Sequence, residues 1–111
     1  MAGKFEINRA AGGKYSFNLK ASNGRIILTS ESYPGKSAAM GGIESVRKNA
    51  GKDANYEHRT SKNGDPYFVL KALNGEIIGT SEMYSTAAAV ETGIASVMEN
   101  APSAEVEDLT A

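Results

Sequence analysis

The chain has 111 residues, of which 41% are hydrophobic and 23% charged, and its net charge is −1. This length and composition are typical of one soluble globular domain. The absence of cysteine excludes disulfides, thiolate nucleophiles and cysteine-ligated metal sites. The sequence contains no run of roughly 18 apolar residues, so no membrane span is expected. The opening MAGKFEINRA lacks the apolar centre of a secretory signal, so we expect a cytoplasmic protein.

The net charge hides an imbalance between the two halves of the chain. Residues 1–50 carry eight Lys or Arg and three Glu, whereas residues 51–111 carry four Lys or Arg and ten Asp or Glu. This split has three interpretations: an anion-binding face on the basic half, two halves that attract each other, or divergence of solvated surface positions.

Two short strands are predicted near the N-terminus. In Lys4–Arg9 the apolar Phe5 and Ile7 alternate with polar residues, and Tyr15–Ala21 alternates in the same way. A period of two indicates a strand with one face toward a core. We expect a hairpin turn to join the two segments.

Asn23-Gly24 predicts the next turn. Between two extended runs this dipeptide favours a two-residue type I′ hairpin, because both turn residues need a positive φ. The register that follows pairs Ala21 with Ile26 and Leu19 with Leu28. Opposed residues share a face, so these four are expected to face the core. Ile27 and Thr29 then lie on the opposite face.

After Tyr33 the apolar residues recur at i, i+4, i+7 and i+11, which is the spacing of one helix face. This stripe consists of Ala39, Ile43, Val46 and Ala50. It predicts an amphipathic helix of roughly 13–16 residues, with Gly35 after Pro34 at its start. Gly42 lies near the edge of the stripe, where a glycine lowers helix stability. We therefore expect the helix to approach the sheet closely at Gly42.

The chain then repeats itself. Segment LKASNGRIILTSESY, residues 19–33, returns as LKALNGEIIGTSEMY, residues 70–84. Aligning residues 5–50 with 56–101 gives about 21 identities in 46 positions, which indicates duplication of one small unit. The second helix stripe consists of Val90, Ile94, Val97 and Ala101, with Ser85 or Thr86 as the N-cap.

We expect one α+β domain over residues 1–111, because a unit of this size buries its apolar face only against the other copy. Repeat one spans about 4–50 and repeat two about 55–101. Residues 104–110 resemble 54–60, which predicts a C-terminal strand that pairs with the opposite half. The fold class is tandem pseudo-symmetric β3-α(-β) repeats that form one mostly antiparallel sheet, with two helices packed on one face.

The repeated L-K-A-x-N-G-x-I-I-x-T-S-E-x-Y, followed by G-I-x-S-V and N-A, resembles the YegP-like family of small uncharacterised bacterial proteins. The resemblance covers nearly the whole chain, in the tandem-repeat form. It implies β3-α-β units in one antiparallel sheet, with exchange of C-terminal strands and helices on one side. It implies no established biochemical activity. The first copy departs from the second at Pro34-Gly35, and Leu28 stands where the second has Gly79.

The helix-free face of the predicted sheet is the leading candidate for a functional surface. Lys20 and Lys71 are identical in the two copies and are expected on this face. The candidate interaction face consists of Lys20, Ile27, Thr29, Tyr67, Val69, Lys71, Ile78 and Thr80. Such a patch fits a protein partner or a second copy of the chain. The alternatives are weak nucleic-acid binding through the basic first repeat, or a solvated face rich in β-branched residues.

An enzyme is the least favoured interpretation, and no catalytic, metal or cofactor site is predicted. His58 is the only histidine and takes the position of Ile7 in the first copy, so we interpret it as a buried or half-buried packing residue. The repeated Thr-Ser-Glu sequence is expected to satisfy amides at a helix N-terminus. A catalytic alternative requires Ser81, Glu82 and His58 to converge.

Overall fold

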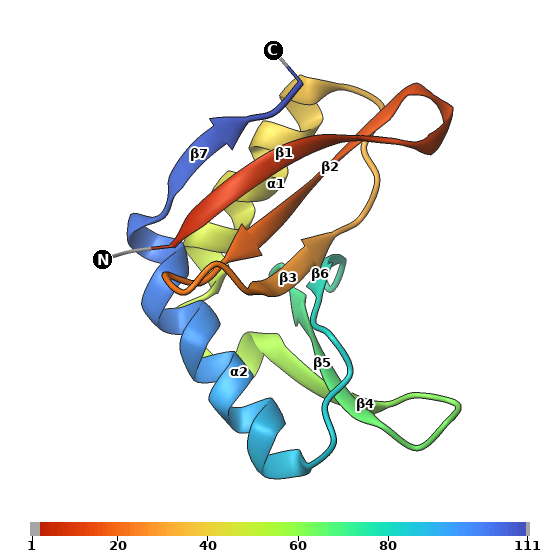
Figure 1. The fold of residues 1–111 in the computed structure, drawn as a ribbon, viewed down its shortest axis with the longest axis vertical. Coiled ribbons are helices and arrows are strands. Elements are labelled where there is room, and N and C mark those ends of the chain that lie inside the picture. The colour runs from red at the N-terminus through yellow and green to blue at the C-terminus, as the bar shows by residue number, and fades with distance from the viewer. Residues whose placement is uncertain (1–2, 111) are drawn as a thin grey trace.

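The computed structural model describes residues 3–110, which form two helices and seven strands (Figure 1). In chain order these are β1 (Lys4–Ala10), β2 (Lys14–Lys20), β3 (Ile26–Ser30), α1 (Lys36–Asn49), β4 (Tyr56–Thr60), β5 (Pro66–Lys71), β6 (Ile77–Thr80), α2 (Ala87–Asn100) and β7 (Glu105–Asp108). The strands join one sheet in the order β4-β5-β6-β3-β2-β1-β7. The predicted α+β class and tandem-repeat arrangement are confirmed.

The sheet order shows how the two repeats are related. The strands β3-β2-β1 mirror β6-β5-β4 about the central pair, and all of these neighbours are antiparallel. The strand β7 follows α2 but runs parallel to β1 of the first repeat, as Figure 1 shows. The C-terminal strand therefore pairs with the opposite half, as predicted.

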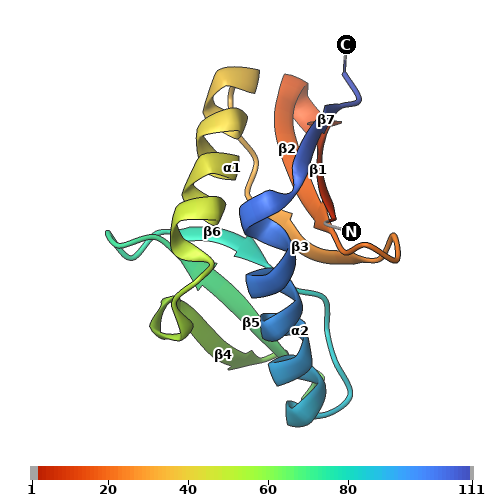
Figure 2. The same cartoon turned by 90° about the vertical axis from the view of Figure 1, so that its left-hand side faces the viewer.

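Both helices bury the stripes predicted for them. All eight stripe residues are at most 2% exposed: Ala39, Ile43, Val46, Ala50, Val90, Ile94, Val97 and Ala101. All of them except Ala39 form one core cluster with the inward side chains of the sheet, and both helices lie on the same side of the sheet (Figure 2). A Cβ on Gly42 would overlap the Tyr33 ring, and one on Gly93 would overlap Tyr84. The close helix-to-sheet approach is confirmed.

The turn at Asn23-Gly24 differs from the predicted type I′ hairpin. Within residues 3–110 only glycines have a positive φ, so Asn23 cannot take the first type I′ position. Gly24 is left-handed, with φ 86°, and its N–H donates to the carbonyl of Ala21 at 2.9 Å. The N–H of Ala21 donates to the carbonyl of Arg25 at 2.9 Å. This is a three-residue loop in which a turn is followed by a left-handed glycine.

A β-bulge next to this turn changes which side chains reach the core. Leu19 pairs with Leu28 as predicted, but the next pair is Lys20 with Ile26, one residue out of the predicted register. Ile27 is thus the extra residue of β3. In a bulge two residues of one strand oppose one residue of its partner. Ile27 accordingly joins Leu28 in the core at 8% exposure, whereas Ile26 is only half-buried.

The second repeat has the same bulge. Leu70 pairs with Gly79 and Lys71 with Ile77, which leaves Ile78 as the extra residue. Ile78 is 4% exposed and belongs to the core. The prediction that the second isoleucine of each Ile-Ile pair lies on an exposed face is therefore wrong, because strict alternation does not survive a bulge.

The strands β3 and β6 pair at the centre of the sheet and connect the two repeats, and we call this pairing the joint. Their ladder pairs Thr29 with Thr80 and Ser30 with Gly79. A Cβ on Gly79 would lie 2.7 Å from Cγ of Leu28, which is closer than packed atoms approach. The difference between the copies at this position thus has a steric cause. Only one leucine fits at the joint.

Ion pairs hold β7 against the first repeat. Lys4 Nζ lies 3.0 Å from Glu107 Oε1, and Lys36 Nζ lies 2.7 Å from Asp108 Oδ2. Hydrogen bonds from Lys36 and Thr110 lower the pKa of Asp108 to about 2. The acidic end of the chain therefore lies on basic residues of the first repeat, which supports the interpretation that the two halves attract each other.

We expect Gly79→Leu to destabilise the domain, because a second leucine at the joint overlaps Leu28. Overpacking a close-packed core costs about 1–3 kcal/mol. Urea unfolding followed by circular dichroism measures the loss. The double variant Leu28→Gly with Gly79→Leu moves the leucine to the other copy and is expected to recover part of the stability. An unchanged unfolding midpoint for the single variant would contradict this account of the joint.

We expect Asp108→Asn to lower stability at neutral pH and to matter little in acid. The ordinary pKa of this group is 3.8, and its folded-state pKa is about 2. The stabilisation is therefore present above about pH 4 and disappears as the pH falls toward 2. Urea midpoints of wild type and variant across this range test it. Glu105→Gln is the control, since Glu105 makes no ion pair within residues 3–110. A pH-independent difference between wild type and Asp108→Asn would contradict the assignment.

Candidate functional site

The residues proposed for the interaction face differ in exposure. Thr29 is exposed, and Lys20, Tyr67, Lys71 and Thr80 are half-buried. The three aliphatic members are at most 8% exposed: Ile27, Val69 and Ile78. The expectation of an exposed apolar patch is therefore wrong, and what remains accessible is hydroxyl, lysine and tyrosine.

Val69 is 1% exposed because polar neighbours on its own face surround it. Glu57 of β4 and Thr80 of β6 are its direct partners across the strands, so both share its face. The Glu57 carboxylate accepts hydrogen bonds from Lys71 Nζ, at 2.6 Å, and from Arg59 Nε. Long charged side chains cover apolar surface with their stems. Both donors lower the pKa of Glu57.

Each repeat builds the same Glu–Lys pair on this face. Lys20 Nζ lies 3.0 Å from Glu6 Oε1, and Lys71 Nζ lies 2.6 Å from Glu57 Oε1. All four residues are identical between the copies. The identity of the two lysines thus has a structural explanation. Sequence reasoning missed the two glutamates, although each occupies the same position on the first strand of its repeat.

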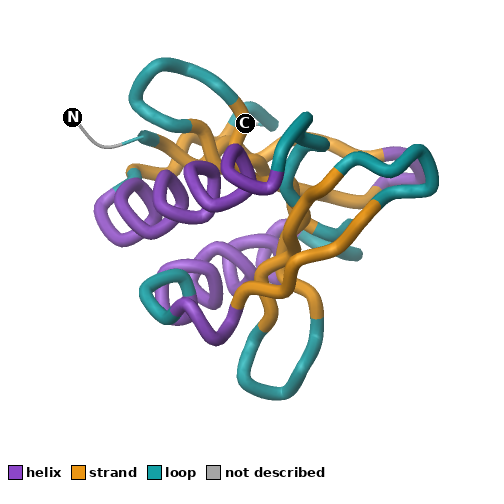
Figure 3. The backbone as a smooth tube through the Cα atoms, turned by 90° about the horizontal axis from the view of Figure 1, so that it is seen from below, coloured by secondary structure: helices purple, strands orange, loops and turns teal. Residues whose placement is uncertain are grey.

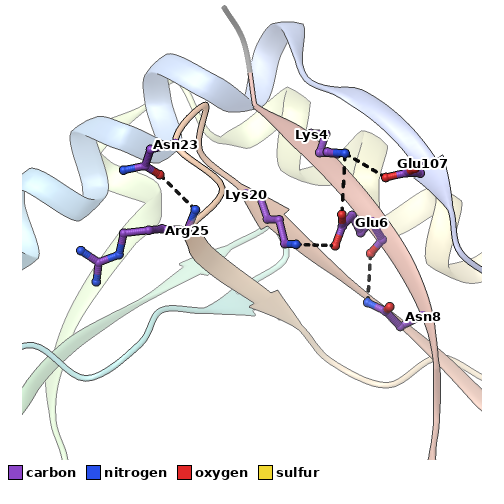
Figure 4. A network of polar contacts seen from close by, with 7 residues as sticks. All are labelled: Lys4, Glu6, Asn8, Lys20, Asn23, Arg25 and Glu107. Carbon is purple, nitrogen blue, oxygen red and sulfur yellow. Dashed lines mark hydrogen bonds and ion pairs between the residues drawn. The ribbon is translucent and has the colours of Figure 1, made fainter.

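In the first repeat this pair belongs to a chain of alternating charges (Figure 4). Lys20, Glu6, Lys4 and Glu107 follow one another across β2, β1 and β7, with N–O distances of 3.0, 3.9 and 3.0 Å. The hydrogen bond to Glu107 raises the pKa of Lys4. Glu6 is only 9% exposed. This network joins the C-terminal strand to the face that carries the candidate residues.

A shallow pocket of about 450 Å³ opens beside this network, between β1, the β2–β3 turn and β7. Lys4 and Lys20 line it together with Glu107. Both lysines already bind glutamate, so the pocket does not offer free cations to an anionic ligand. Across residues 3–110 no cluster of three or more His, Asp or Glu side chains is placed to hold a metal ion.

The serines of the Thr-Ser-Glu segments are hydrogen-bonded within the sheet. Ser30 Oγ accepts the N–H of Phe17 at 2.8 Å and donates to the carbonyl of Glu31. Ser81 Oγ accepts the N–H of Phe68 at 3.0 Å in the same way. The structural interpretation is therefore confirmed, but the amide that each serine satisfies belongs to a neighbouring strand. This is β2 for Ser30 and β5 for Ser81, near the point where the backbone pairing of the two strands ends. The predicted role at the helix N-terminus is wrong, and Thr86 caps α2 instead.

His58 does not approach Ser81. It lies on β4 opposite Phe68 of β5, and Ser81 bonds Phe68 from the other side. The imidazole instead pairs with Glu91 of α2 and its side chain is 53% exposed. The expectation of a packing histidine is wrong, because β4 is an edge strand. The catalytic alternative built on these residues is not supported by their geometry.

Neither helix within residues 3–110 is long and apolar enough to cross a membrane.

Two stretches of the chain, residues 10–57 and 61–108, match a family described as a domain of unknown function, DUF1508. The chain is 52% identical over 110 residues to a UPF0339 protein of Shewanella oneidensis, covering 99% of this chain and 100% of that protein. It is 51% identical over 108 residues to UPF0339 protein YegP of Yersinia pestis, covering 97% and 96%.

A solved structure shares this fold. The NMR structure of yegP from E. coli, a protein of unknown function, superposes with a TM-score of 0.92 at 50% identity, covering 98% of this chain and 94% of that chain. The names of these relatives indicate no enzymatic activity. The chain therefore belongs to the DUF1508 family, as a tandem-repeat relative of the UPF0339 proteins that include YegP.

Proposed function

We propose that this chain is a non-enzymatic binding module that engages a protein partner through the helix-free face of its sheet. The supporting observation is the pseudo-symmetric centre of that face. Pairing of β3 with β6 sets Thr29 beside Thr80. Lys20 and Lys71 lie on the adjacent strands, two residues beyond the direct partners of the threonines. Both helices pack against the other side (Figure 3).

The polar character of this face sets the kind of partner. With the aliphatic side chains buried, a partner meets hydroxyl groups and two lysine–glutamate pairs, with the half-buried Tyr67 ring on β5. Charged and polar groups contribute specificity and association rate more than raw affinity. We therefore expect a transient complex with a polar protein surface, weakened by salt.

Nucleic-acid binding by the basic first repeat is the alternative, and it is less favoured. Four of the eight basic residues within 1–50 are held in ion pairs with acidic side chains: Lys4, Lys20, Lys36 and Arg47. A phosphate backbone would have to displace these carboxylates to neutralise its own charge.

We expect Thr29→Arg to abolish partner capture, because it places a long cation at the centre of the face without touching an ion pair. Thr92→Arg is the matched control, since Thr92 is exposed on α2, on the helical side. Immobilised wild type and both variants are compared by mass spectrometry of bound proteins at two salt concentrations. The proteins lost with Thr29→Arg should be retained by Thr92→Arg and weakened by salt.

Equal capture by wild type and Thr29→Arg would overturn the proposal. Nuclease treatment of the extract separates the alternative, because a partner set lost after nuclease is held through nucleic acid. Direct binding to labelled RNA or DNA at low salt, with affinity that falls steeply as salt rises, would favour the alternative instead.

A further inference from the structure

Within residues 3–110 the outermost strand of the first repeat has a further strand paired to it, whereas that of the second repeat does not. In the first repeat β7 covers the edge of β1, and Ile7 is 1% exposed. In the second repeat β4 ends the sheet of residues 3–110, and its equivalent residue, His58, has a side chain that is 53% exposed. Figure 1 shows β5 on one side of β4 and, in the part of the chain that the structure describes, no strand on the other side. The segment that follows α1 is β4 itself, so no further strand of the first repeat remains to cover this edge.

The open edge presents free backbone groups. In the β4–β5 hairpin the N–H of Ser61 donates to the carbonyl of Asp65 at 2.8 Å. Inward hydrogen bonds alternate along an antiparallel strand, so the backbone groups of Tyr56, His58 and Thr60 point away from β5. The N–H of Tyr56 donates to the carbonyl of Asp53, so the N–H groups that the edge offers are those of His58 and Thr60. On β1 the carbonyl equivalent to that of His58 is that of Ile7, and it accepts the N–H of Leu109 at 3.0 Å.

We propose that the open edge of β4 pairs antiparallel with β4 of a second copy of this chain. When His58 lies opposite its own counterpart, Glu57 of each copy faces Arg59 of the other. Only alternate residues of β4 point their backbone N–H and C=O groups outward, so the two strands can shift relative to each other only in steps of two residues. A shift by one step places Glu57 opposite Glu57 or Arg59 opposite Arg59, and opposed like charges destabilise a sheet. One register is selected, and the contact closes about a two-fold axis.

The charges also disfavour an acidic strand like β7 at this edge. On β1 that strand is held by Lys4 and Lys36. Their counterparts in the second repeat are Asn55 and Ala87, so these two basic anchors are missing. The edge strand carries one acidic and one basic residue on the same face, and this pattern complements itself.

Sedimentation equilibrium of the full chain over roughly 0.01–1 mM tests the proposal, since a contact between five-residue strands is at the weak end of interfaces. The apparent mass should rise from monomer toward dimer. His58→Pro removes an outward N–H but no bond to β5, and should weaken dimerisation about tenfold or more. His58→Ala removes the same imidazole and keeps the N–H, so it should dimerise like wild type. Thermal unfolding checks that both variants are folded.

Charge variants provide a second test that leaves the backbone intact. Glu57→Arg and Arg59→Glu each place two like charges on β4, so each alone should stay monomeric. Mixed in equal amounts they oppose unlike charges at both positions and should form a heterodimer. A wild type that stays monomeric to about 1 mM would leave the edge to a strand of another protein and overturn self-pairing. A dimer unaffected by His58→Pro, or charge variants that dimerise alone, would also overturn it.

Discussion

The contact between Leu28 and Gly79 is the constraint on which the rest of the structure depends. It lies where β3 and β6 pair, and that ladder turns two three-stranded units into one sheet. With no Cβ at position 79, one leucine fills the space and the strands come together. Across the joint α1 packs on β6 and α2 on β3, so the two repeats share one core. A unit of about 50 residues alone would leave its apolar face exposed.

Polar residues that are identical in the two copies serve the same structural roles twice. Ser30 and its counterpart each replace a missing backbone partner, and Glu6 pairs with Lys20 as the equivalent residues pair in the second repeat. A buried N–H without an acceptor costs free energy, which explains why both copies keep the serine. Identity between the copies is therefore evidence about folding. Functional surfaces have to be sought where the repeats combine or where they differ.

The proposed binding face lies where the two repeats combine, and the proposed dimer edge lies where they differ. The helix-free face is a product of combination, because Thr29 and Thr80 come together only when the repeats pair. The edge of β4 is a product of difference, because one C-terminal strand serves two repeats and covers β1 alone. Glu57 belongs to both surfaces, since it binds Lys71 on the face and would meet Arg59 of a second copy at the edge. Thr29 lies only on the face and the backbone of His58 only at the edge, so variants at these two positions test the proposals separately.

Sequence alone determined the elements, the helix stripes, the repeat and the presence of a C-terminal strand. These follow from local periodicity and from similarity between segments, both of which are visible in one chain. Tertiary structure decided the bulge that buries Ile27, the polar cover over Val69 and the exposure of His58. Each of these depends on a backbone angle at a turn or on a neighbour from another strand. The pairing of Lys4 with Glu107 shows the reason, since contacts between the two ends of the chain decide which edge is covered.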